Sequence, residues 1–144
     1  MTQKDKELLL KDLCARLPYH PILKWTNISD GSSINGELKD LSEVTLFFIS
    51  QSETTEVKPY LRPMSSMTEE EFESLKKWTR LEFDQLELTE WDNGYKTLEF
   101  YLNEIPSYVV VEVFDFLNTH HFDYRGLIEK GLALEAPEGM YRTE

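Results

Sequence analysis

Apolar and polar positions alternate with a helical period at the start of the chain. Within residues 2–17, four leucines recur at near-helical spacing: Leu9, Leu10, Leu13 and Leu17. The pattern predicts an amphipathic helix that has Lys4, Lys11 and Asp12 on its polar side and ends before Pro18.

The helical spacing of apolar residues gives way to short β-favouring runs between Pro21 and Pro63. Four short β-favouring runs follow one another there, at residues 22–28, 34–38, 44–49 and 56–61. Turn-forming residues separate them, so the segment predicts a small antiparallel β-meander. Because Pro59 has no N–H to donate, the last run is expected at a sheet edge or where the chain leaves the sheet.

A second helix is expected after residue 68. Thr68 and Glu71 have the spacing of a capping box, and acidic residues in a first turn suit the helix dipole. We expect the glutamates to face water. The inward stripe is Phe72, Leu75, Thr79 and Phe83, with Trp78 beside it.

Residues 86–100 carry the clearest local signal, a β-hairpin around Asp92-Asn93-Gly94. A three-residue loop with Gly94 left-handed gives sensible partners on both faces. The pairs are Trp91 with Tyr95, Glu90 with Lys96, Thr89 with Thr97, Leu88 with Leu98, and Leu86 with Phe100. A two-residue loop would place polar residues opposite apolar ones, so the three-residue register is predicted.

The C-terminal part predicts further helices. Apolar residues at Val110, Val113, Phe114 and Leu117 have helical spacing, and Ser107 is expected to cap this helix, although the composition of residues 108–114 also suits a strand. Asp123 or Tyr124 then opens a short helix over residues 125–130, and residues 136–144 are expected to be irregular. The chain therefore predicts one α+β domain over residues 1–144: N-terminal helix, small antiparallel β-meander, central helix, β-hairpin and C-terminal helices.

Composition and charge limit the kinds of molecule that the protein is expected to bind. Of 144 residues, 40% are hydrophobic and 12% aromatic, which excludes intrinsic disorder. The formal charge is −12, the wrong sign for binding nucleic acid or an anionic membrane surface directly. Residues 1–67, 68–92 and 93–144 carry net charges of −1, −6 and −5, so the acidity lies in the C-terminal half.

The sequence also predicts a soluble, cytoplasmic protein. No apolar run approaches the roughly 18 residues of a membrane span, and residues 8–10 are too few for a signal peptide. The single cysteine, Cys14, excludes an intrachain disulfide and a thiol metal cluster. We expect it to be buried and inert.

One cluster has residue types that could carry chemistry. His120, His121, Asp123, Tyr124 and Arg125 follow one another at the end of the long helix. They are the candidate binding residues, and an alternative function is a small metal-dependent hydrolase or nuclease using His120, His121 and Asp123.

The spacing of this cluster argues against a metal site. Adjacent helical residues point about 100° apart, so the two histidines do not easily share an ion. We expect one histidine to pack or cap the helix end, the other to be solvated, and Asp123 to cap the next helix. No catalytic residue, metal or cofactor is assigned. Acidic pairs such as Glu69 with Glu73 are too abundant to mark a glycosidase or a divalent-cation site.

Three blocks of the sequence resemble a known family. They are residues 6–19 (KELLLKDLCARLPY), 58–71 (KPYLRPMSSMTEEE) and 114–141 (FDFLNTHHFDYRGLIEKGLALEAPEGMY), 56 of the 144 residues. They are similar to blocks of a family of small uncharacterised proteins from phages, prophages and mobile elements of Bacteroides-type gut bacteria. The resemblance implies a setting in the bacterial cytoplasm and supplies no activity or site residue.

These observations favour a non-enzymatic accessory protein that binds another, unidentified protein in a regulatory, counter-defence or acidic-mimic role. An acidic surface steers association with a basic patch, including the nucleic-acid site of a host protein. A homodimer, a small-molecule sensor and a structural part of a particle stay open. A pocket holding both histidines would favour the enzyme, and a flat surface with an exposed apolar patch would favour the binder.

Overall fold

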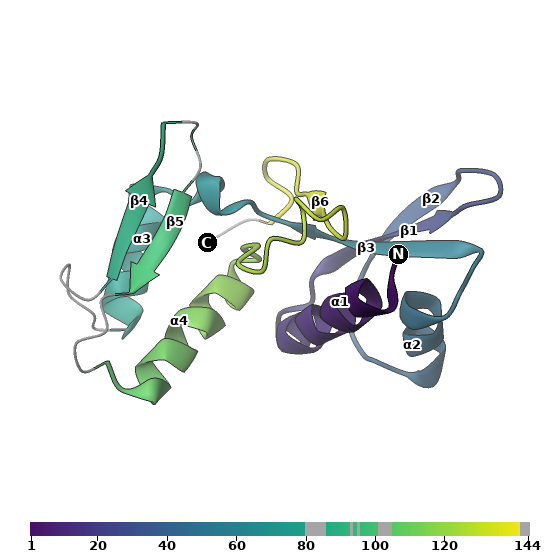
Figure 1. The fold of residues 1–144 in the computed structure, drawn as a ribbon, viewed down its shortest axis with the longest axis horizontal. Coiled ribbons are helices and arrows are strands. Elements are labelled where there is room, and N and C mark those ends of the chain that lie inside the picture. The colour runs from purple at the N-terminus through teal and green to yellow at the C-terminus, as the bar shows by residue number, and fades with distance from the viewer. Residues whose placement is uncertain (80–85, 93, 95, 101–104, 142–144) are drawn as a thin grey trace. The chain divides into compact units, whose positions relative to one another are not determined.

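The computed structural model describes residues 1–79, 86–92, 94, 96–100 and 105–141, which form two compact units (Figure 1). The first unit comprises Met1–Leu61 and Arg125–Glu144, and the second comprises Arg62–Tyr124. Helices and strands in two separate sheets confirm the α+β class. The single domain over residues 1–144 stays a prediction. Within the described ranges, no helix is both long and apolar enough to cross a membrane.

The N-terminal helix is confirmed as α1 (Gln3–Arg16). A capping box begins it, because Asp5 N donates to Thr2 Oγ1 at 3.1 Å while Thr2 N donates to Asp5 Oδ2 at 2.9 Å. The expected positions of Asp12 on the polar side and of Cys14 in the interior are both wrong. Asp12 lies on the buried side of the helix, and Cys14, two residues further on, is exposed.

A buried ion cluster explains the position of Asp12. Asp12 and Arg16 are both fully buried, and Arg16 Nε donates to Asp12 Oδ2 at 2.7 Å. Arg125 Nε lies 3.2 Å from the other carboxylate oxygen. A buried carboxylate needs such partners because an uncompensated charge is expensive in a low-dielectric interior. Asp12 therefore joins α1 to the segment that returns to the first unit.

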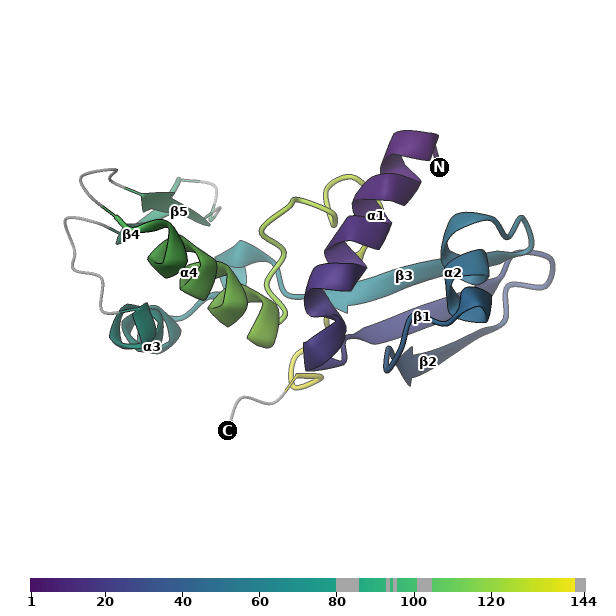
Figure 2. The same ribbon diagram turned by 90° about the horizontal axis from the view of Figure 1, so that it is seen from below.

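Four strands form the sheet of the first unit: β1 (Ile22–Asn27), β2 (Ser33–Glu37), β3 (Thr55–Leu61) and β6 (Leu134–Glu135). Their order is β2-β1-β3-β6, with β1 antiparallel to β2 and β3 and with β6 parallel to β3. Figure 2 shows β1 between β2 and β3. Strand β3 is not an edge strand, since it lies between β1 and β6, but it is the strand from which the chain leaves the first unit, after Leu61. The proline is tolerated because β6 pairs only with Tyr60 and Leu61, beyond it.

The third expected strand of the meander, residues 44–49, is wrong. It lies in a helix, α2 (Glu43–Ser50). A short continuous apolar run is ambiguous between strand and helix, and Ser42 decides for the helix by accepting from Thr45 N at 3.3 Å. Phe48 then packs edge-to-face on Trp25 of β1, with ring centroids 6.0 Å apart. Helices α1 and α2 lie on the same face of the sheet (Figure 1).

The end of the chain packs on this sheet without a helix. The helix expected over residues 125–130 is wrong: the segment forms turns, with Gly126 and Gly131 at φ of +73° and +74°. The described part of the expected irregular tail, residues 136–141, is confirmed as irregular. Tyr141 anchors it, because its hydroxyl accepts from Ile22 N at 2.7 Å and donates to Tyr60 O at 2.8 Å. Burial raises the pKa of Tyr141 to about 12.

The second unit begins with a 3-10 turn (Met64–Ser66) and the predicted helix α3 (Glu69–Thr79). The expected capping box is present, with Glu71 N donating to Thr68 Oγ1 at 3.1 Å and Thr68 N donating to Glu71 Oε1 at 3.2 Å. The described residues of the expected stripe are buried, namely Phe72, Leu75 and Thr79. Phe83 lies outside the described residues.

The hairpin is confirmed as β4 (Leu86–Glu90) and β5 (Lys96–Phe100). Every predicted pair from Leu86–Phe100 to Glu90–Lys96 has the predicted register. Gly94 has φ of +80°, and its N–H donates to Trp91 O at 2.8 Å. Asn93 and the Trp91–Tyr95 pair lie outside the described residues.

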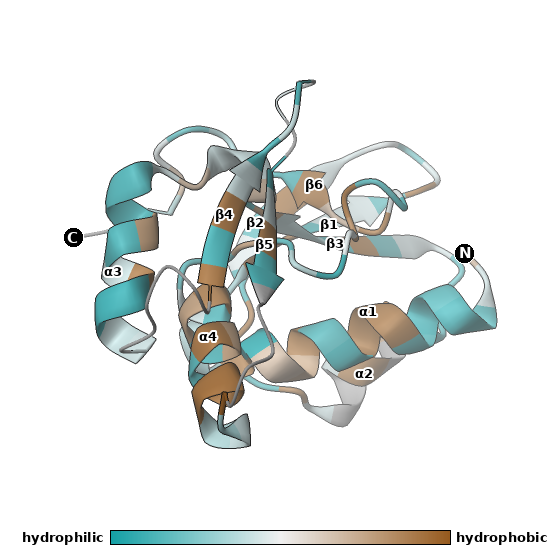
Figure 3. Ribbon diagram, turned by 60° about the vertical axis from the view of Figure 1, so that its left-hand side comes forward, coloured by the Kyte–Doolittle hydropathy of each residue, from teal (hydrophilic) through white to brown (hydrophobic). Residues whose placement is uncertain are grey.

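The long helix is confirmed as α4 (Ser107–Thr119), but its expected cap is wrong. Pro106 is the N-cap residue and Ser107 is already helical. Helix α4 is mostly apolar, whereas α3 is mostly polar (Figure 3). The two helices and the hairpin share one buried cluster: Met67, Phe72, Leu75, Leu86, Val109, Val113, Phe116, Leu117 and Phe122.

Replacing Gly94 by alanine is expected to destabilise the protein. A Cβ at this position would meet nothing within 4 Å, so the cost comes from the left-handed backbone and amounts to about 1 kcal/mol or more. Urea unfolding would measure it. Gly36→Ala is the matched control, because Gly36 also has open space and is not left-handed. Equal unfolding midpoints for the Gly94→Ala variant and the unmodified protein would contradict the assignment.

Candidate functional site

The histidine cluster singled out in the sequence lies at the end of α4. His120 is the C-cap residue, its Nδ1 lies 3.0 Å from Phe116 O, and its ring stacks on the Phe116 ring at 4.1 Å. This confirms that one histidine packs against and caps the helix end.

The expectation for the second histidine is wrong. His121 is only 8% exposed, because its left-handed backbone (φ +62°) turns the chain back along Arg62. Arg62 N donates to His121 O at 2.7 Å, and Asp123 N donates to Arg62 O at 2.8 Å. Asp123 is buried in this bridge, and residues 125–130, which were expected to form the helix that it caps, form turns.

Tyr124 and Arg125 make contacts of their own. Tyr124 donates to Asn118 Oδ1 at 2.9 Å, and Arg125 belongs to the first unit, where it pairs with Asp12. In the part of the chain that the structure describes, no three His, Cys, Asp or Glu side chains form a group that could hold a metal ion. The contacts found for His120, Tyr124 and Arg125 are a helix cap, a side-chain hydrogen bond and an ion pair within the fold.

A residue that the sequence did not single out organises this region. Arg62 binds both carboxylate oxygens of Glu71 at 2.7 Å and donates to Ser66 O at 3.3 Å. Its guanidinium also lies 4.2 Å from the centroid of the Phe122 ring. We call this set the Arg62 clasp. The expectation that the glutamates of α3 face water is therefore wrong for Glu71.

The pKa of Glu71 reflects this environment. Burial acts to raise the pKa, but the hydrogen bonds from Arg62 and from the Thr68 backbone outweigh it, so the pKa of Glu71 lies below its ordinary value. Glu71 is thus held as a carboxylate by the clasp and by the helix cap.

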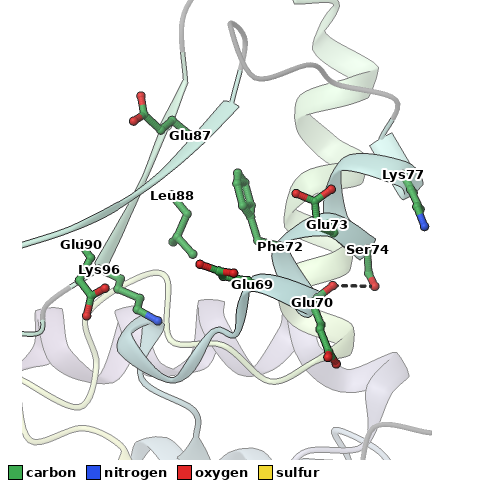
Figure 4. A pocket seen from close by; sticks show the side chains of 10 residues that line it. All are labelled: Glu69, Glu70, Phe72, Glu73, Ser74, Lys77, Glu87, Leu88, Glu90 and Lys96. Carbon is green, nitrogen blue, oxygen red and sulfur yellow. Dashed lines mark hydrogen bonds between the residues drawn. The ribbon is translucent and has the colours of Figure 1, made fainter.

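A groove lies between α3 and the hairpin within the second unit (Figure 4). Its volume is about 970 Å³. Phe72 of α3 and Leu88 of β4 line its apolar part, and Phe72 is 7% exposed. Ten residues line it in all: Glu69, Glu70, Phe72, Glu73, Ser74, Lys77, Glu87, Leu88, Glu90 and Lys96.

Negative charge dominates this acidic groove, since five of the lining residues are glutamates and two are lysines. Lys96 already donates to Met67 O at 2.7 Å, and Glu73 pairs with Lys76 at 2.8 Å. No ion pair within 4 Å among the described residues engages three of the glutamates: Glu69, Glu70 and Glu90. The second unit as a whole has 14 acidic and 5 basic residues, a net charge of −9.

The polar side chains of the lining are mostly acceptors around an apolar strip, and they suit a ligand that is both cationic and apolar. The hydroxyl among them, Ser74 Oγ, donates to Glu70 O one turn back in α3 at 3.0 Å. The hairpin register already placed Leu88 and Glu90 on one strand face. No signal in the sequence indicated that this face and the start of α3 border the same groove.

Comparisons with protein-family models, curated proteins and solved structures found no match to the chain.

We predict that the purified protein contains no stoichiometric zinc, manganese or iron by elemental analysis. The ring of His120 is stacked and bonded at the helix end, which leaves too few converging ligands for a transition metal. A chelator should therefore leave the melting temperature unchanged. One equivalent of metal that survives dialysis, with a lower melting temperature after chelation, would contradict this and favour the hydrolase.

Proposed function

We propose that this protein acts without catalysis, by binding another protein through the acidic groove of its second unit. The observation that carries the proposal is the combination of the apolar strip at Phe72 and Leu88 with three glutamates, Glu69, Glu70 and Glu90, that make no ion pair within the described part of the chain. Apolar contact with the half-buried Leu88 and with the edge of Phe72 that stays exposed supplies affinity, and the carboxylates select a basic partner.

Long-range electrostatics supports the same partner class. A unit with a net charge of −9 attracts a basic surface and repels nucleic acid and anionic lipid. Steering of this kind raises association rates by about 10–10³ and weakens as salt screens the charges. The partner is therefore a protein with a basic face, which includes a nucleic-acid site that the groove would cover as an acidic mimic.

The proposal also places the protein among the accessory proteins of a phage or mobile element. Its basis is the resemblance of residues 6–19, 58–71 and 114–141 to proteins of phages, prophages and mobile elements. In that setting the protein is an accessory factor with a regulatory or counter-defence role in the cytoplasm of a Bacteroides-type host. No described contact favours the alternative hydrolase or nuclease at His120, His121 and Asp123.

Capture of the partner from the bacterial host tests the function. The unmodified protein should retain one partner at stoichiometric level, and the purified pair should dissociate as salt rises. The groove variant neutralises the three carboxylates without changing their size: Glu69→Gln, Glu70→Gln and Glu90→Gln. It should bind the purified partner at least about tenfold more weakly, because attraction of a basic face falls with the charge removed.

The matched control removes the same charge from exposed positions of the first unit: Glu53→Gln, Glu129→Gln and Glu138→Gln. It should bind as the unmodified protein does. Failure to retain any stoichiometric partner, or equal weakening by both variants, would contradict the proposal.

A further inference from the structure

We infer, resting on the proposed function, that the groove takes a short linear segment of the partner in which an apolar side chain is flanked on both sides by lysine or arginine. The apolar side chain lies on Phe72 and Leu88, and the flanking cations pair with carboxylates on the two walls of the groove (Figure 4).

The two walls supply the three parts of this recognition. On α3, Glu69 and Glu70 occupy the exposed first turn, and Phe72 follows on the inward face. On the hairpin, Leu88 and the exposed Glu90 are two residues apart and share a strand face. In Figure 4 the side chains of Leu88 and Phe72 lie between Glu90, at the left of the view, and Glu70, towards the right. The order across the groove is therefore carboxylate, apolar strip, carboxylate.

Lysine and arginine suit both features at once. Their methylene stems cover apolar surface while the charged head stays at the solvent boundary, where the exposed glutamates lie. Arginine also forms bidentate bonds with carboxylates. The two lysines of the groove do not remove the need for such cations, because the lining keeps a net charge of −3 when both are counted.

A linear segment matches the site better than a small polyamine does. A cavity of about 970 Å³ is at the upper end of the range for small-molecule pockets, which is about 300–1,000 Å³. A polyamine would satisfy the carboxylates but has no bulky apolar group for Phe72 and Leu88. A segment with an apolar anchor covers both, in the manner of other groove-bound peptides.

Synthetic peptides test the inference with the intact protein. The probe is a fluorescein-labelled peptide with a central leucine and two arginines on each side. One comparison peptide replaces the leucine by serine, and another replaces the arginines by glutamines. Fluorescence anisotropy at low and at high salt gives the dissociation constants, and spermidine is the competitor.

We expect the leucine–arginine peptide to bind at least about fivefold more tightly than the serine peptide and tenfold more tightly than the glutamine peptide. The groove variant should bind the leucine–arginine peptide at least about tenfold more weakly than the unmodified protein does. The first-unit control should lose less than about twofold in affinity for the same peptide. The Leu88→Ala variant should remove most of the preference for leucine over serine. If that variant does not fold, the two peptides still measure the apolar anchor on the unmodified protein.

Three results would overturn the inference. They are equal affinity for the leucine and serine peptides, equal affinity of the groove variant and the control for the leucine peptide, and displacement of the peptide by equimolar spermidine. These failures differ from failure of the proposed function. If a purified partner binds and needs the groove glutamates while no peptide binds, the proposed function stands. The groove then takes a folded basic face instead of a linear segment. Peptide binding without any host partner would contradict the function alone.

Discussion

The second unit depends on the pairing of Arg62 with Glu71. Arg62 is the first residue of this unit, and the segment that completes the unit returns beside it, bonded through His121 O and Asp123 N. A guanidinium only 16% exposed needs a carboxylate partner, because breaking such a pair leaves an uncompensated charge. Glu71 supplies both oxygens, and the ring of Phe122 lies under the cation. One side chain thus joins the start of the unit, its end and the first turn of α3.

The acidic groove follows from this constraint and from the hairpin. Glu71 closes the capping box of α3, so the positions of Glu69, Glu70 and Phe72 along the first turns are set once Glu71 is held. The opposite wall is set by the register of β4 and β5, which keeps Leu88 on the packed face. Concentrated negative charge destabilises a compact unit through self-repulsion. A basic partner in the groove, as proposed, would relieve that repulsion on binding.

Sequence patterns predicted what local geometry decides. The hairpin register, Gly94, the capping box of Thr68 and Glu71 and the helical period of α4 each depend on residues a few positions apart, and all were confirmed. The errors arose where distant segments decide. Asp12 is buried because Arg125 reaches it, and residues 44–49 are helical because Ser42 caps them and Phe48 meets Trp25. Each wall of the groove was predictable on its own, but no local pattern brings the two walls together. The clasp was missed because nothing local pairs Arg62 with one of three neighbouring glutamates.

A double-mutant cycle on Arg62→Gln and Glu71→Gln, followed by urea unfolding, tests the clasp most directly. The glutamine at position 71 keeps an acceptor for the helix cap, so the cycle isolates the ion pair. The two side chains are 16% and 15% exposed, and the account predicts a coupling free energy of about 1–2 kcal/mol, together with faster amide exchange at His121 and Asp123 in either single variant. Additive effects, with a coupling below about 0.3 kcal/mol and unchanged exchange, would contradict the clasp as the constraint on which the second unit depends.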